Sequence, residues 1–387
     1  MRVFVDLTEF LASQKRTGIQ RVCGQMCRHW PGEEPLTPVK LRSDGRLVQL
    51  PSETLGLIRE YFDVPDSRAS GLKNRLAEVS RQAESSEELV DLQPDWRVLV
   101  PELFYDPSRV AFFRSLSAEQ LNCFYFIIYD LLPFTHPEFF IEHAPQEIIN
   151  GYTRVLRSAR HVAFISIYTR DAYYRRLLRK TCSSAGPVLP LGSDGLGEQR
   201  SGPAFRSQRP KFTVVGTIEP RKNHALILDV FEPLLHQIEG LRLVFLGQLG
   251  WVDSVLAERV RSLAGGRCPG FEHHAEANDE LIRRHVLESW ATIYISAAEG
   301  FGLPPVESLW LGTPVIASSA VPSLEAINRA GVHIVESLNA PNLREAVLAF
   351  LEGSYANRKS EEAMSLNLPT WRRFTLEVAK WCKQDTH

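Results

Sequence analysis

The chain has 387 residues, of which 44% are hydrophobic and 23% are charged, so it is long enough for two globular domains. Its formal net charge of −2 provides no global basic field, which argues against nucleic acid as a partner. Asp6 and Glu9 interrupt the apolar N-terminal run, which excludes a signal peptide, and the most apolar run, residues 123–129, is too short to span a bilayer. The six cysteines are scattered without a Cys-x-x-Cys pair, so we expect a reduced, cytoplasmic protein.

Short, continuously apolar runs alternate with helical patterns along the chain. Such runs are typical of strands that are covered on both faces, and their alternation with helices predicts a parallel α/β architecture. The expected strands lie at residues 2–6, 96–101, 123–130, 161–166, 211–216, 242–247, 292–296, 314–318 and 332–335. A stretch rich in Gly, Ser, Pro and Arg at residues 193–210 is typical of a linker, so we expect two domains that join there.

A basic amphipathic helix is expected at residues 170–180. Tyr173, Tyr174, Leu177 and Leu178 share one side of this helix, and arginine and lysine side chains share the other. The apolar side is either packed in the core, which is the commoner case, or laid on an anionic membrane surface.

The first motif with chemical meaning follows the strand that ends at Gly216. A helix is expected after Asn223, which would be its N-cap. Arg221 and Lys222 stand just before this helix, where a guanidinium and an ammonium group can clamp a diphosphate. The alternative is a solvated basic pair on a loop.

The second motif places Glu299 and Glu307 around a Gly-Phe-Gly loop. The loop joins the strand at residues 292–296 to a helix that starts with two prolines. Open α/β sheets bind ligands at this edge, glycines permit close approach, and a helix N-terminus favours an anion. Glu307 alone could serve only the helix dipole. Together, the two motifs match the parts of a nucleotide sugar.

The polar segment His-His-Ala-Glu at residues 273–276 is the nearest approach to a metal-ligand set. We interpret it as a solvated cluster on a loop, so the sequence predicts no metal site.

The segments EGFGLPPVES…LGTPVIAS and VGTIEPRKN resemble the donor-binding half of retaining glycosyltransferases of family 4. The resemblance implies the GT-B fold, an α/β architecture in which two Rossmann-like domains with parallel sheets face a central cleft. It implies an N-terminal acceptor-side domain at residues 1–192 and a nucleotide-sugar-binding domain at residues 193–368. Residues 369–387 would form a helix that crosses back to the first domain.

The resemblance also implies roles for single residues. Glu307 would bind the ribose, and Glu299 would lie at the donor sugar near the reacting carbon. Arg221 and Lys222 would hold the diphosphate and stabilise it as the leaving group. Contacts to the donor are further expected from Gly216, Thr217, Gly300, Phe301, Gly302 and Leu303.

A weaker resemblance extends over the first half of the chain. The segment TGIQRV is similar to the family's first glycine-containing loop, so Gly18 would approach the donor phosphates. Many members have His-Asp where this chain has Tyr129 and Asp130, and the resemblance therefore implies that an imidazole contact to the sugar would be missing. Asp130 is a candidate for the acceptor side, and the alternative is a cap of the turn at Leu131–Pro133.

The expected function is that of a metal-independent, retaining hexosyltransferase without a cofactor. Its donor would be GDP-mannose or a related deoxy sugar, and its acceptor a saccharide or lipid-linked saccharide of bacterial O-antigen or capsule. A peripheral contact with the inner face of the cytoplasmic membrane belongs to the same expectation. One alternative is a glycoside hydrolase that uses Glu299 and Glu307. Another is a non-catalytic scaffold that binds a nucleotide sugar.

Overall fold

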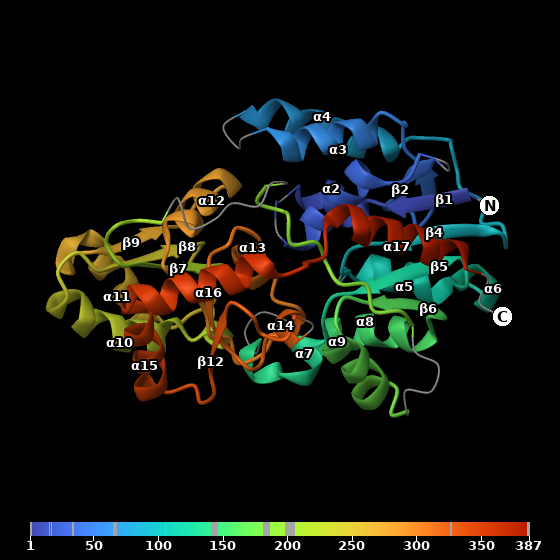
Figure 1. Ribbon diagram of the computed structural model, residues 1–387. Coiled ribbons are helices and arrows are strands. Elements are labelled where there is room, and N and C mark those ends of the chain that lie inside the picture. Colours follow the sequence, from blue (N-terminus) through green and yellow to red (C-terminus); the bar gives the residue numbers. More distant parts are fainter. Residues whose placement is uncertain are drawn as a thin grey trace. The chain divides into compact units, whose positions relative to one another are not determined.

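The computed structural model describes residues 2–14, 16, 18–32, 35–64, 68–104, 106–140, 146–180, 186–197, 206–325 and 327–384 (Figure 1). The chain forms two compact units: Met1–Pro137, Ala144–Gly192 and Thr370–His387 make the first, and Glu138–His143 and Ser193–Pro369 make the second.

This division differs from the one expected from the sequence mainly in the segment Glu138–His143, which groups with the second unit. The other difference is Pro369, which also groups with the second unit. The segment Glu138–His143 groups with the second unit because of Trp251. The indole N–H of Trp251 donates to the Phe139 carbonyl at 2.8 Å, and its ring centroid lies 5.9 Å from that of Phe140.

The first unit contains a six-stranded sheet in the order β3-β2-β1-β4-β5-β6. Neighbouring strands are parallel, except that β3 is antiparallel to β2 at the edge. The sequence does not predict β2 and β3, because Pro38 and Lys40 break the apolar pattern of β2. The strands are β1 (Arg2–Asp6), β2 (Leu36–Leu41), β3 (Leu47–Gln49), β4 (Trp96–Val100), β5 (Phe124–Ile128) and β6 (His161–Phe164).

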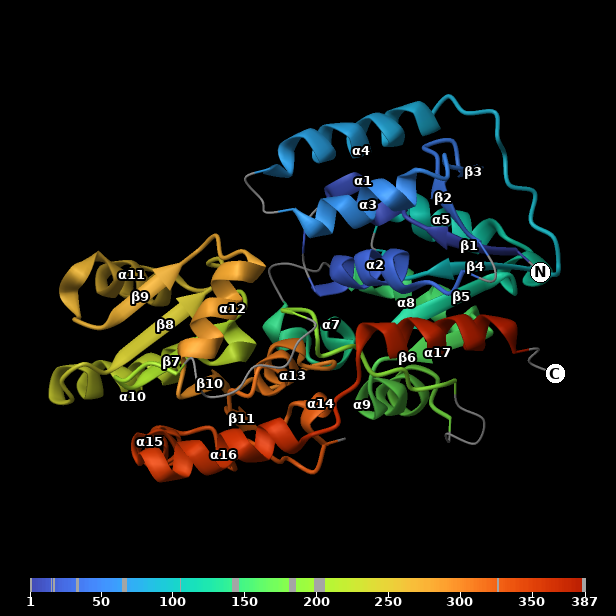
Figure 2. The same cartoon turned by 45° about the horizontal axis from the view of Figure 1, so that its top comes forward.

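Helices cover both faces of this sheet (Figure 2). Phe124 and Phe126 of β5 share an apolar core with Phe113 of α5, whereas the ring of Tyr125 lies 5.0 Å from that of Trp381 in α17. Successive side chains of a strand point to opposite faces, so α5 and α17 lie on opposite faces. The helices are α1 (Thr8–Ser13), α2 (Gly18–His29), α3 (Thr54–Asp63), α4 (Ser70–Ala83), α5 (Pro107–Ser115), α6 (Ala118–Leu121), α7 (Leu132–Thr135), α8 (Gln146–Ser158), α9 (Ile167–Asp171) and α17 (Trp371–Lys383).

The second unit contains a six-stranded sheet in the order β12-β11-β10-β7-β8-β9, in which every neighbouring pair is parallel. Counted from the first strand of each unit, both sheets have the order 3-2-1-4-5-6 of doubly wound dinucleotide-binding folds. The expectation of two Rossmann-like domains is therefore confirmed. The strands are β7 (Lys211–Val215), β8 (Arg242–Leu246), β9 (Phe271–His274), β10 (Ala291–Tyr294), β11 (Val315–Ser318) and β12 (Val332–Val335).

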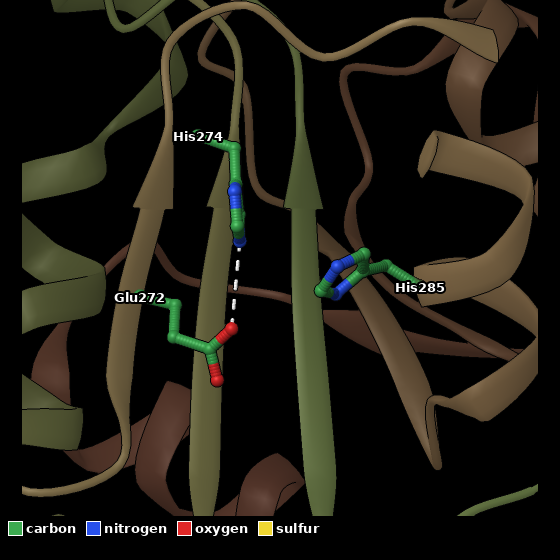
Figure 3. A group of neighbouring side chains, drawn as sticks. All are labelled: Glu272, His274 and His285. Carbon is green, nitrogen blue, oxygen red and sulfur yellow. Dashed lines mark hydrogen bonds and ion pairs between the residues drawn. The ribbon is translucent and has the colours of Figure 1, made fainter. Parts of the chain in front are cut away.

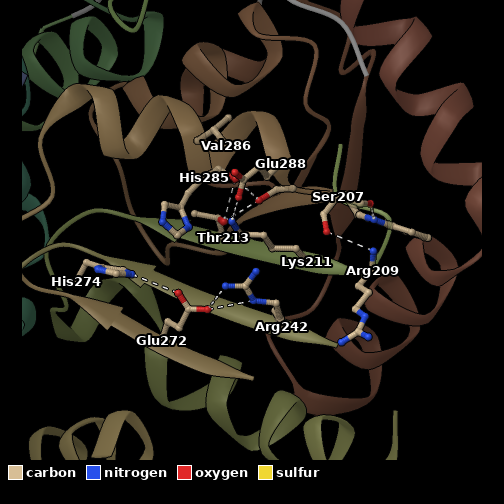
Figure 4. A network of polar contacts seen from close by, with 12 residues as sticks. Ser207, Arg209, Lys211, Thr213, Arg242, Glu272, His274, His285, Val286 and Glu288 are labelled. Carbon is tan, nitrogen blue, oxygen red and sulfur yellow. Dashed lines mark hydrogen bonds and ion pairs between the residues drawn. The ribbon is translucent and has the colours of Figure 1, made fainter. Parts of the chain in front are cut away.

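The two faces of the second sheet differ in polarity. Phe212 and Phe245 pack with Phe231 of α10 in an apolar core. On the other face, the Lys211 ammonium lies 2.6 Å from the Glu288 carboxylate of α12 (Figure 4). The helices are α10 (His224–Gln237), α11 (Ser254–Ser262), α12 (Asp279–Glu288), α13 (Leu303–Trp310), α14 (Pro322–Glu325), α15 (Ala340–Leu351) and α16 (Gly353–Ser365).

Strand β9 corrects the prediction of a polar loop at residues 273–276. His273 and His274 end this strand at the edge of the sheet. The polar sequence hides the strand because its side chains have polar partners on the neighbouring strand and turn. Glu272 pairs with Arg242 of β8, and His273 Nε2 lies 2.8 Å from the Gly247 carbonyl oxygen.

The segment at residues 170–180 packs its apolar side in the core of the first unit. Tyr173 and Leu177 are buried, and Arg175 is exposed. This arrangement agrees with the core-packing alternative. No helix in the part of the chain that the structure describes is long and apolar enough to cross a membrane.

Candidate functional site

The turn that follows β7 brings Lys222 back over the end of the strand. Gly216 has a φ of 129°, and a Cβ at this position would collide with the Lys222 ammonium nitrogen. A side chain here would therefore strain the backbone and displace the ammonium group. Glycine at this position is what lets the ammonium group approach the end of β7.

Arg221 and Lys222 lie in a short 3-10 turn, Pro220–Lys222, directly before α10. Their side chains are 15% and 12% exposed, so they do not form the solvated pair that was the alternative. The Arg221 guanidinium lies 2.6 Å from the Glu219 carboxylate and also pairs with Glu299. The Lys222 ammonium lies 3.8 Å from Glu219. The turn thus gathers two cations and two acids.

Hydrogen bonds tie this turn to the loop that follows β10. The Ala297 N–H donates to the Arg221 carbonyl at 2.7 Å, and the Asn223 side chain donates to the Ile295 carbonyl at 2.8 Å. Asn223 precedes α10 as predicted, but its φ is 56° and its side chain makes no cap bond. The N-cap expectation is therefore wrong about the hydrogen bond, because the amide holds two loops together instead.

Glu299 lies in the loop after β10 and is 7% exposed. Besides pairing with Arg221, its carboxylate accepts a hydrogen bond from the Tyr294 hydroxyl at 2.8 Å. Burial, reinforced by the Glu299 carboxylate, raises the pKa of Tyr294 well above its ordinary value, so the phenol stays neutral and donates. Burial also lowers the pKa of the Lys222 ammonium, an effect that Glu299 opposes.

The glycine-rich loop is fixed in place by the segment before α14. Gly302 has a φ of 92°, and a Cβ there would collide with Val321. The Ser323 N–H donates to the Phe301 carbonyl at 2.9 Å, and the Ser323 hydroxyl donates to the Gly302 carbonyl at 2.8 Å. Gly300, Phe301 and Gly302 are buried, so the loop is a packed part of the unit.

Helix α13 follows the glycine-rich loop, as the sequence predicts, but it starts at Leu303, one residue before the two prolines, so that its first turn contains Pro304 and Pro305. Proline has no N–H, so Leu303 and Val306 are the two of the first four residues that can donate to an anion. This helix start offers fewer donors than the argument from the sequence assumes. Glu307 is the fifth residue and is 4% exposed. A buried carboxylate needs polar partners, so Glu307 is more than an exposed acid at a helix N-terminus.

The two predicted residues of the first half lie in the other unit. Gly18 is exposed at the start of α2, and no atom that the structure describes lies within 4 Å of where its Cβ would stand. Asp130 follows β5 and accepts a hydrogen bond from the Leu132 N–H at 3.0 Å. This is the hydrogen bond expected if Asp130 caps the turn at Leu131–Pro133. Tyr129 is buried, and its hydroxyl donates to the Pro101 carbonyl.

Glu219 and Tyr294 belong to the cluster but are missed by reasoning from the sequence. Glu219 is buried, and its position beside Pro220 in the motif is the signal that could have found it. Tyr294 reads as an ordinary strand residue, and only the fold brings its hydroxyl to Glu299.

Residues 197–367 match the family of glycosyl transferases group 1. The serotype-specific mannosyltransferase WbdA of Escherichia coli is 24% identical over 273 residues, which cover 64% of this chain and 32% of WbdA. The O-antigen chain mannosyltransferase B of Escherichia coli is 31% identical over 149 residues, which cover 35% of this chain and 38% of that protein. This chain therefore spans about a third of the length of the curated relatives that it matches.

Solved structures of similar fold cover nearly the whole chain. HepE of Anabaena, in complex with UDP and glucose, superimposes over 100% of both chains with a TM-score of 0.65 at 13% identity. Sucrose-phosphate synthase from Thermosynechococcus elongatus covers 99% of this chain and 98% of its own, with a TM-score of 0.64 at 15% identity. The predicted GT-B fold class is thereby confirmed. The chain combines this fold with a region, residues 197–367, that is similar in sequence to the group 1 glycosyl transferases.

Proposed function

We propose that the protein is a retaining glycosyltransferase that moves a hexose or deoxyhexose from a nucleoside-diphosphate sugar to a saccharide or lipid-linked saccharide. The observation that carries the proposal is the Arg221 guanidinium held between two buried carboxylates, Glu219 and Glu299. These groups follow β7 and β10, adjacent strands at whose carboxyl ends open α/β sheets bind ligands. A planar guanidinium fork can hold two phosphate oxygens at once.

The cluster can exchange one of its anions. In the structure, the Arg221 guanidinium is shared between Glu219 and Glu299. A diphosphate would compete for the same guanidinium and release a carboxylate. Arg221 and Lys222 would then stabilise the negative charge that grows on the leaving diphosphate. The released Glu299 carboxylate would face the positive charge that grows on the sugar ring.

The remaining contacts follow from the loops around this cluster. Glu307, buried at the start of α13, would bind the ribose hydroxyls. The backbone at Gly216 and Thr217, and from Gly300 to Leu303, would meet the phosphates and the sugar. The proposal includes the roles predicted for the first unit: Asp130 would lie on the acceptor side, and Gly18 would approach the phosphates of the donor.

The donor that we favour is GDP-mannose or a related deoxy sugar. Two Escherichia coli relatives are named mannosyltransferases, and one of these names refers to the O-antigen chain. We therefore propose a role in bacterial surface polysaccharide assembly, in the cytoplasm or at the inner face of its membrane, without a cofactor or a metal in the transfer. The UDP in the HepE structure makes a uridine nucleotide the donor to test against.

Calorimetry with GDP and UDP, followed by kinetics with GDP-mannose, a GDP-deoxyhexose and UDP-glucose, tests the proposal. Glu307→Gln should weaken binding of the bare nucleoside diphosphate by roughly tenfold to a hundredfold, the value of a charge-assisted hydrogen bond. Glu299→Gln should bind that ligand as well as the unchanged protein or better, because a competitor for Arg221 is gone. The turnover of Glu299→Gln should fall by a similar factor, because the Glu299 carboxylate contributes mainly in the transition state.

The exposed Glu361 of α16 provides the matched control, since Glu361→Gln should change neither quantity. The anomeric configuration of the product, read by NMR, tests retention. Equal loss of nucleotide affinity in the Glu299 and Glu307 variants would contradict the assignment. Release of sugar from a simple glycoside would favour the hydrolase, and donor binding without transfer or hydrolysis would favour the scaffold.

A further inference from the structure

A second cluster of ionisable side chains lies on the polar face of the sheet in the second unit. Glu272 and His274 of β9 and His285 of α12 place one potential ligand atom each within 4.8 Å of one another (Figure 3). Glu272 and His274 are two residues apart on a strand, so they point to the same face. Helix α12 covers that face and brings His285 to them (Figure 4).

His285 is the unusual member of this cluster. Its side chain is 3% exposed, and neither ring nitrogen has a hydrogen-bond partner among the residues that the structure describes. Buried polar groups are nearly always hydrogen-bonded, and an exception calls for an explanation such as a bound ion.

Glu272 is oriented by a neighbour on the adjacent strand. Arg242 of β8 donates through Nε to Glu272 Oε1 at 3.0 Å. The other oxygen, Oε2, lies 3.4 Å from Nε2 of His274. The ring of His274 is in turn 5.2 Å from the ring of His285, measured between centroids. One carboxylate oxygen and two imidazoles therefore lie close to one another.

We propose that Glu272, His274 and His285 bind a divalent transition-metal ion of the zinc class. Zinc takes imidazole nitrogen and carboxylate oxygen at roughly 2.0–2.2 Å, which puts tetrahedral ligand atoms about 3.4 Å apart. The separations of up to 4.8 Å would have to close by about an ångström or more, which side-chain rotation of Glu272 and His274 on the edge strand can provide. A fourth position would remain for water.

The surrounding charges predict which ions bind. Arg242 and Lys211 are close to the cluster, but each is paired with an acid, Glu272 and Glu288 respectively. Arg284 adds a further positive charge near His285. A divalent ion therefore enters a region with more cations than acids, so we expect weaker binding than at a site of cysteine thiolates. Two imidazole ligands select zinc, nickel or copper over magnesium or calcium, which prefer oxygen ligands.

The position of the cluster indicates a structural role. The metal would join α12 to β9, which is the edge strand of the sheet. Helix α12 leads directly into β10, and β10 leads to the loop that carries Glu299. An ion that binds the folded state alone raises the stability of that state. A metal at this site would therefore stabilise the elements that lead to the loop of Glu299 without touching the donor.

The test uses the full chain, without a polyhistidine tag and stripped of metal by a chelator. Calorimetry with Zn²⁺ should show one equivalent bound, and Co²⁺ should develop the intense visible absorption of a tetrahedral site. At Zn²⁺ about 100 times the dissociation constant, the melting temperature should rise by roughly 5–10 °C. His285→Gln and His274→Gln should each weaken Zn²⁺ binding tenfold or more. His236→Gln, which removes an exposed histidine of α10, should leave it unchanged.

Three results would overturn the proposal: no saturable Zn²⁺ binding to the unchanged protein, Zn²⁺ binding by both ligand variants as tight as by the unchanged protein, or Mg²⁺ binding as tight as Zn²⁺ binding. If His285→Gln fails to fold, His274→Gln decides alone, because His274 is only half-buried. The readout is metal binding in the absence of any nucleotide. It therefore stands or falls separately from the proposed transferase activity.

Discussion

The two units place charged residues at equivalent points of two sheets that have the same strand order. Asp6 ends β1 and Glu102 follows the adjacent strand β4 in the first unit, and Glu219 and Glu299 follow β7 and β10 in the second. Each pair of strands is the point at which the strand order reverses, where doubly wound sheets bind ligands. Comparing the two units shows which properties come from this position in the fold and which come from the particular side chains that stand there.

The cluster of the first unit is rich in acids. Arg109 lies 2.8 Å from Asp6 and 3.5 Å from Glu9. Glu102 accepts a hydrogen bond from the Phe10 N–H at 2.6 Å, and burial raises its pKa to about 8, so it is mainly protonated at neutral pH. In the second unit, by contrast, Arg221 and Lys222 provide two cations for two acids.

This difference separates a structural cluster from a binding cluster. Arg109 is fully buried, and its guanidinium is already used by Asp6 and Glu9. Arg221 and Lys222 are partly exposed, and by our proposal a phosphate reaches them. The same topological position therefore serves stability in one unit and, by our proposal, anion binding in the other.

The largest effect should come from exchanging each arginine for methionine. Arg109→Met leaves Asp6 buried without its cation, which should lower the free energy of unfolding by about 3–5 kcal/mol. The midpoint of urea denaturation measures this change. Nucleotide affinity, measured at a temperature where the variant is folded, should not change.

Arg221→Met should show the opposite balance. Its side chain is partly exposed, so the loss of stability should be smaller. Nucleoside-diphosphate affinity and turnover should fall instead, with turnover lower by roughly a hundredfold or more. Equal loss of stability and equal nucleotide affinity in the two variants would remove the distinction between the clusters.

A pH effect of about 3 kcal/mol should distinguish the acids of the first unit. Glu102 keeps its proton up to a pH of about 8 in the folded state, whereas the unfolded chain releases it near the ordinary glutamate pKa of 4.5. The unfolded state therefore binds fewer protons between these pH values, and this group lowers stability as the pH rises. Glu102→Gln should gain about 3 kcal/mol relative to the unchanged protein between pH 5.5 and 8.

Chemical denaturation at the two pH values provides that measurement. The exposed Glu119 is the matched control, since Glu119→Gln should follow the unchanged protein at both. A Glu102→Gln variant with the same pH profile as the unchanged protein would mean that Glu102 is ionised in the folded state.

The fold was predictable where burial leaves a simple pattern. Strands buried on both faces are continuously apolar, and these lie where the sequence predicts them. Strands β2 and β9 were missed because their polar side chains have partners distant in the sequence: Lys40 pairs with Glu84, and Glu272 with Arg242. Pairings across such distances leave no local signal.

The candidate site shows the same limit. Arg221 and Glu299 could be singled out because each stands in a short motif with a turn and a helix start. Their contact with each other, and the Tyr294 hydroxyl on Glu299, depend on β7 and β10 being neighbours in the sheet. His285 was not found because its helix, rather than its sequence neighbours, brings it to β9.

A smaller effect is expected from Arg221→Lys, which keeps the charge. A guanidinium can contact a carboxylate and a phosphate together in a planar fork, whereas an ammonium group is a point charge. We expect a loss of about tenfold in donor affinity or turnover, close to 1.4 kcal/mol. Calorimetry and steady-state kinetics measure it. Unchanged values would mean that the cluster around Arg221 uses only the positive charge of this side chain and not the planar shape of the guanidinium.

The smallest effect on transfer should come from removing metal ions. Arg221 and Lys222 already supply positive charge where the diphosphate would leave, so excess EDTA should not change the initial rate measured well below the melting temperature. If zinc binds at Glu272, His274 and His285, the same treatment should lower the melting temperature, and added Zn²⁺ should restore it without changing the rate. Loss of transfer in EDTA that Mg²⁺ or Mn²⁺ restores would show that the two cations are not sufficient. The contrast between an acid-rich cluster in one unit and a cluster whose own cations are sufficient for the transfer in the other would then fail.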